Sequence, residues 1–162
     1  MSVESILSST IEAAVGIGGF AGIIAAIRQR GVAHWPAEQR LLLQMLLTAS
    51  AATVLFCLLP WLLDEIGIPQ SISWRLCSGM LFVWLVGIGM RRRRQFQNFT
   101  HPVPLPRLIY VWMIIIQTLQ AINLFLGEPW PFMLGVVGLL ANGFTFFLLL
   151  LFWEVRESEK SG

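Results

Sequence analysis

Most side chains able to do chemistry lie between or beyond the long apolar stretches of this chain, and only a few polar ones lie within those stretches. Glu12 and Arg75 are ionisable residues inside two such stretches. At 1.5 Å per residue, Glu12 lies about 9 Å and Arg75 about 5 Å from the expected outer ends of their helices. Gln117, Gln120 and Asn123 belong to a third stretch and approach the same surface. These five residues predict a polar cluster in the outer half of the protein.

Two interpretations of this cluster remain open. In one, Glu12 and Arg75 form an ion pair and the amides hydrogen-bond across helices, so that the cluster fixes the register of the bundle. In the other, the cluster lines a water-filled vestibule or an ion site, because a charge at membrane depth normally faces a partner or water. Asn142, near the middle of the last apolar stretch, is either a helix contact or part of a polar path.

The elements that position these side chains are expected to be transmembrane helices. The chain is 56% hydrophobic and 12% charged, whereas soluble domains carry about 25% charged residues. A membrane span needs about 20 mostly apolar residues. The sequence therefore predicts an all-α, polytopic membrane bundle made of one domain, 1–162, with five transmembrane helices, or four if the first is re-entrant. The predicted spans are 6–27, 41–63, 72–90, 108–126 and 132–153.

The basic residues predict how the chain crosses the membrane. They concentrate in the connections after the first and third spans and in the C-terminal tail, whereas Asp64, Glu65 and Glu128 lie in the other connections. The positive-inside rule then places the N-terminus outside and the C-terminus in the cytoplasm. The dominance of arginine and the short loops favour a bacterial inner membrane.

Small residues recur every four positions along the first span. This stripe consists of Thr10, Ala14, Gly18, Gly22 and Ala26. Small residues let two helix backbones approach closely in lipid, where packing drives association. The stripe predicts either tight packing within one protomer or self-association, and we expect a homo-oligomer.

The four consecutive arginines Arg91, Arg92, Arg93 and Arg94 directly follow the third span. Such juxtamembrane clusters attract anionic lipid, so we expect them to contact anionic lipids at the cytoplasmic face and not to bind nucleic acid. His34 and His101 fall in separate loops, and no metal site or cofactor is expected. Motifs of hydrolases, metalloproteases and phosphate-binding loops are absent from the sequence, so we expect no enzymatic activity.

These expectations favour one function and leave an alternative. The first is a homo-oligomeric ion channel or small-solute permeation protein with the polar cluster around Glu12. The alternative is a non-catalytic membrane subunit that binds and positions or regulates another membrane protein. Self-association and conductance distinguish the two, because only the channel should form a closed symmetric assembly that leaks ions.

Overall fold

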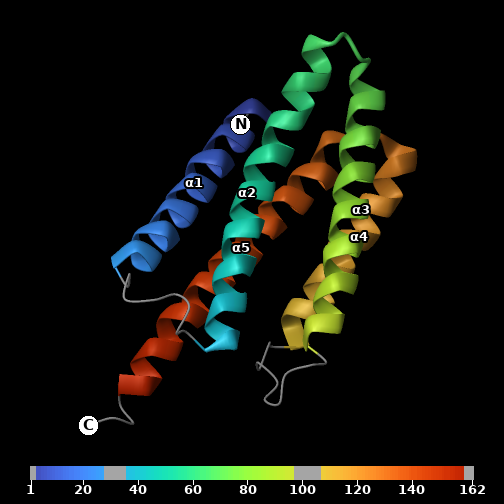
Figure 1. The fold of residues 1–162 in the computed structure, drawn as a ribbon. Helices are drawn as coiled ribbons and strands as arrows, with labels where there is room; N and C mark the ends of the chain where they lie inside the picture. Colours follow the sequence, from blue (N-terminus) through green and yellow to red (C-terminus); the bar gives the residue numbers. More distant parts are fainter. Residues whose placement is uncertain (1–2, 28–35, 97–106, 159–162) are drawn as a thin grey trace.

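The computed structural model describes residues 3–27, 36–96 and 107–158, and they fold into five helices (Figure 1). The helices are α1 (Val3–Ile27), α2 (Ala37–Glu65), α3 (Gln70–Phe96), α4 (Arg107–Leu126) and α5 (Pro129–Ser158). The all-α prediction is confirmed, and each predicted span lies inside one helix. The helices run a few residues beyond the spans because helical hydrogen bonding continues through polar ends, such as the arginines of α3.

Length and composition make most of these helices compatible with a membrane. Within the described residues, four helices contain a segment long and apolar enough to cross one, and α4 contributes a shorter apolar segment, Val111–Leu126. Large apolar side chains cover the outside of the bundle, among them Leu55, Val83 and Phe125, which are 68%, 69% and 82% exposed. Soluble monomers rarely expose apolar surface on this scale. The fold therefore indicates a membrane protein.

Two tight turns set the arrangement of α2 to α5. Gly67, at φ +80°, donates its N–H to the Asp64 carbonyl at 2.9 Å and ends α2. Gly127, at φ +73°, donates to the Asn123 carbonyl at 2.9 Å and ends α4. Both glycines adopt the left-handed conformation that other residues enter only at a cost. The turns produce two antiparallel helix pairs, α2 with α3 and α4 with α5.

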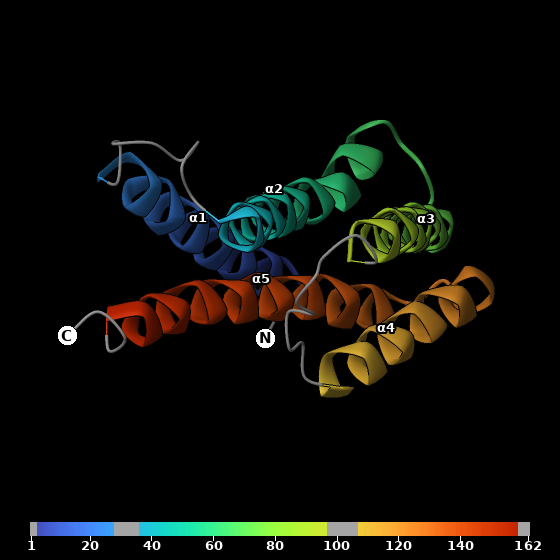
Figure 2. The same cartoon turned by 60° about the horizontal axis from the view of Figure 1, so that its bottom comes forward.

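The helix α5 is the central element of the bundle, and it packs against each of the other helices. The helix α1 packs against α2 and α5. In both ribbon views α1 lies at one side of the bundle, and α3 and α4 lie together at the opposite side (Figures 1 and 2). This order decides which polar side chains can meet.

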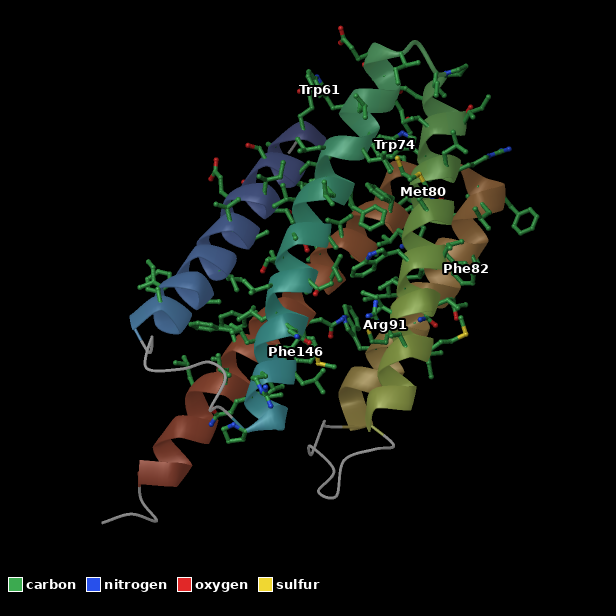
Figure 3. The ribbon with its side chains drawn as sticks, viewed as in Figure 1. Trp61, Trp74, Met80, Phe82, Arg91 and Phe146 are labelled. Atoms are coloured by element: carbon green, nitrogen blue, oxygen red, sulfur yellow. The ribbon has the colours of Figure 1, made fainter. Side chains whose placement is uncertain are left out.

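Two apolar clusters form the core of the described part of the chain. The larger one joins α2, α3, α4 and α5 and contains the ring pair Trp74 and Phe132, whose centroids are 5.9 Å apart. The smaller one joins α1, α2 and α5 around Ala21, Leu46 and Leu150. In Figure 3 Trp61 and Trp74 lie in the upper half of the bundle, and Arg91 and Phe146 lie in the lower half.

Candidate functional site

The amides predicted for the outer cluster hold helix ends together. Asn123 is fully buried at the end of α4. Its Nδ2 donates to the Ser78 hydroxyl of α3 at 2.7 Å and to the Glu128 carbonyl at 2.8 Å. Its Oδ1 accepts the Glu128 backbone N–H at 3.0 Å. One side chain thereby joins α3, the end of α4 and the start of α5.

Gln120 continues this contact one turn deeper. It is fully buried, and its Nε2 donates to the Pro131 carbonyl of α5 at 2.6 Å. Its Oε1 is buried and has no hydrogen-bond partner among the described residues. A Cβ on Gly135 would collide with this amide and would lie 2.8 Å from Cδ2 of Leu81. The amide therefore occupies space that only a glycine leaves open.

The contact between α4 and α5 extends to mid-span. A Cβ on Gly138 would collide with Ile116, so the two helices approach closely here. One turn further along α5, Asn142 Nδ2 lies 2.7 Å from the Met113 sulfur, a weak acceptor. Gln117 is half-buried and makes no hydrogen bond with any described residue. The amides that are hydrogen-bonded therefore connect helices.

Glu12 and Arg75 lie apart from each other. Both side chains are exposed, and no ion pair joins them in the part of the chain that the structure describes. The reason is the helix order, because α1 lies on the side of α2 and α5 that faces away from α3 (Figure 2). The sequence predicts similar depths for these residues, but depth alone does not specify which helices are neighbours.

The small-residue stripe of α1 divides into two parts. Thr10 and Ala14 are buried, and a Cβ on Gly18 would lie 3.3 Å from the Ser50 Cβ of α2. Gly22 and Ala26 are exposed. Each four-residue step advances about 40° around a helix, so the stripe turns by about 160° between its ends. Only its first part can face the same neighbours.

The small-residue stripe does not include a second pattern on α1. Glu12, Gly16, Gly19, Ile23 and Ala26 recur at spacings of four and three, which keeps them on one side of a helix. All five are exposed, and a Cβ at Gly16 or Gly19 would have no neighbour within 4 Å. We call these five residues the α1 outer face. It lies opposite the buried side of α1 and combines an acid with open glycines.

The structure describes only part of the arginine cluster and neither histidine. The backbone of all four arginines after the third span belongs to α3, and the Arg91 side chain is exposed. The side chains of Arg92, Arg93 and Arg94 lie outside the described residues, as do His34 and His101. The described residues include no group of three metal-ligating side chains.

Comparisons with known proteins add no further constraint. No family model, curated protein or solved structure matches this chain.

Proposed function

We propose that this chain is a non-catalytic integral membrane protein that acts by binding other transmembrane helices through the α1 outer face. The observation that carries this proposal is the exposure of Glu12 beside Gly16 and Gly19. A charged side chain within a span is costly, by about 2.5–3.5 kcal/mol at the helix centre on insertion scales and by less nearer the surface. A partner helix that offers a polar or basic group would offset this cost, and the open glycines would let its backbone approach closely.

The proposed membrane topology is the one that the charges favour. The N-terminus would lie outside and the C-terminus in the cytoplasm, with the arginines at the end of α3 in contact with anionic lipids of a bacterial inner membrane. Cysteine accessibility at Glu4 and Arg91 tests this topology. A reagent that cannot cross the membrane should label Glu4→Cys and should not label Arg91→Cys in intact cells.

Photo-crosslinking tests the binding surface itself. A photoreactive residue at Ile23 should form adducts with protein, because Ile23 belongs to the α1 outer face. The matched control is Leu55 of α2, which is 68% exposed against 56% for Ile23 and is expected to face lipid. Protein adducts at Ile23 and lipid adducts alone at Leu55 support the proposal. Lipid adducts alone at both positions contradict it.

Ion permeation is the second candidate, and Glu12 is the observation that favours it. The hydrogen bonds of Gln120, Asn123 and Asn142 give these amides structural partners inside one protomer. A path lined by Glu12 would therefore have to form between copies of the chain. Ion flux into liposomes that depends on Glu12 and rises with protein density would support this function, and tight liposomes at all densities would contradict it.

A further inference from the structure

Glu12 of α1 and Arg75 of α3 have opposite charges, and no described residue forms an ion pair with either. Both side chains are exposed. Arg75 lies beside the turn that ends α4, since its Nε would be 2.9 Å from a Cβ on Gly127. The neighbouring Glu128 carboxylate does not pair with Arg75 in the described structure either. Both charges are therefore available on the outside of the bundle.

The positions of the two charges in their predicted spans give similar depths, about 9 Å for Glu12 and about 5 Å for Arg75 from the outer ends. Ile11, next to Glu12, and Trp74, next to Arg75, both border the larger apolar cluster, which extends over several helical turns. Figure 3 places Trp74 in the upper half of the bundle, away from Arg91. The helices α1 and α3 also run in the same direction, each starting at its upper end (Figure 1). A side-by-side copy without vertical displacement would thus bring the charges to similar depth.

The charges lie on opposite sides of the bundle, so one protomer cannot pair them. A two-fold contact between two α1 outer faces would bring Glu12 near a second Glu12, which is unfavourable. A head-to-tail contact instead sets α1 of one copy against α3 of the next, and repetition of such a contact closes a ring if the rotation permits. Charge complementarity therefore favours the head-to-tail contact.

We propose that the α1 outer face binds a second copy of this chain, with Glu12 paired to Arg75 of the partner subunit. This inference rests on the proposed function, because it names the occupant of the same surface. Gly16 and Gly19, one and two turns below Glu12, let α3 of the neighbour approach the α1 backbone. The contact gives each charge an oppositely charged partner, which neither has among the described residues of its own protomer.

Charge reversal tests the pairing. Fluorescence energy transfer between labelled copies in vesicles, measured at increasing lipid-to-protein ratios, gives the association constant. Glu12→Arg and Arg75→Glu should each lower this constant about five- to thirtyfold, from the range of interhelical polar contacts. The double variant with both changes should recover most of the loss. Glu4→Gln, at the exposed start of α1, is the matched control and should leave association unchanged.

Cysteine crosslinking tests the geometry with both charges intact. Ser8 and Ser71 are exposed and lie one turn before Glu12 and Arg75. With Cys57 and Cys77 replaced by alanine, copies carrying Ser8→Cys should crosslink to differently tagged copies carrying Ser71→Cys. Crosslinks formed only between two Ser8→Cys copies would indicate a two-fold contact and overturn the proposal. A loss of association that the double charge reversal does not restore would also overturn it.

Different results would overturn self-association and the proposed function. Protein adducts at Ile23 to a different chain, with no crosslink between Ser8→Cys and Ser71→Cys copies, would overturn self-association and leave the proposed function standing. Lipid adducts alone at Ile23, together with no crosslink, would overturn both.

Discussion

Gly135→Ala is the substitution whose effect follows most directly from the geometry of the α4 and α5 contact. The added methyl group would collide with the Gln120 amide and would lie 2.8 Å from Cδ2 of Leu81. Gln120 is fully buried, so its side chain has little room to move. The variant should therefore lose the hydrogen bond from Gln120 to the Pro131 carbonyl and strain the packing around it.

The expected magnitude combines three effects. Loss of an interhelical hydrogen bond in a membrane costs about 0.6 kcal/mol on average and up to about 1.7 kcal/mol. Overpacking costs about 1–3 kcal/mol, and alanine regains up to about 1 kcal/mol of helix propensity. The net expectation is a destabilisation of about 1–3 kcal/mol. Gly87→Ala is the matched control, because a Cβ at Gly87 has no neighbour within 4 Å, and it should be neutral or slightly stabilising.

Reversible unfolding by SDS in mixed micelles, followed by tryptophan fluorescence and circular dichroism, measures these free energies. A double-mutant cycle with Gln120→Ala separates the collision from other effects. Once the amide is removed, the penalty of Gly135→Ala should fall by at least about 1 kcal/mol, a coupling within the range found for contacting residues. An equal penalty in both backgrounds, or a Gly135→Ala variant as stable as Gly87→Ala, would show that the Gln120 amide does not need the space beside Gly135.

Three further predictions concern the turns, the amides and Glu12. Gly127→Ala should destabilise the protein by more than about 2 kcal/mol, whereas Gly67→Ala should cost about 1 kcal/mol. Both glycines have positive φ, but only at Gly127 would a Cβ meet a backbone atom, at 2.8 Å. Unfolding in SDS measures both free energies. Asn123→Ala should lower the free energy of unfolding by about 2 kcal/mol, because it removes three hydrogen bonds. Asn142→Ala should lower it by about 0.5 kcal/mol or less, because the hydrogen bond that it removes is to the Met113 sulfur, a weak acceptor. Equal losses would contradict the structural roles assigned to the two amides. Glu12→Gln should abolish any cation flux that the wild-type protein shows in liposomes, and flux that is unchanged would exclude Glu12 from the conducting surface.

The sequence predicts the helices well and their neighbours poorly. Apolar runs specify the five helices because a stretch of about 20 such residues has few other stable conformations in lipid. Asn123 and Gln120 reach the start of α5 because only a short turn separates α4 from α5, but the cluster predicted from the sequence does not specify this contact. The partner of Glu12 depends on helix order around the bundle, which hydropathy and depth leave open.

The small residues of α1 illustrate the same limit at the scale of one helix. A spacing of four relates Thr10 to Ala26, but this spacing drifts around the helix and joins residues that face different surroundings. The alternating spacing of four and three from Glu12 to Ala26 holds its direction and defines the α1 outer face. The exposure of that face depends on tertiary packing, so the sequence alone could not show that it lacks a neighbour within the protomer.

Glu12→Gln and Asn123→Ala, compared in the same two assays, separate a role of the α1 outer face between chains from a role of the buried amides within one chain. If the α1 outer face acts between chains and the amides act within one chain, Glu12→Gln should weaken association in vesicles and leave unfolding in SDS within about 0.5 kcal/mol of wild type. Asn123→Ala should destabilise the fold. Unchanged association of Glu12→Gln, or a loss of fold stability as large as that of Asn123→Ala, would contradict a role of the α1 outer face between chains.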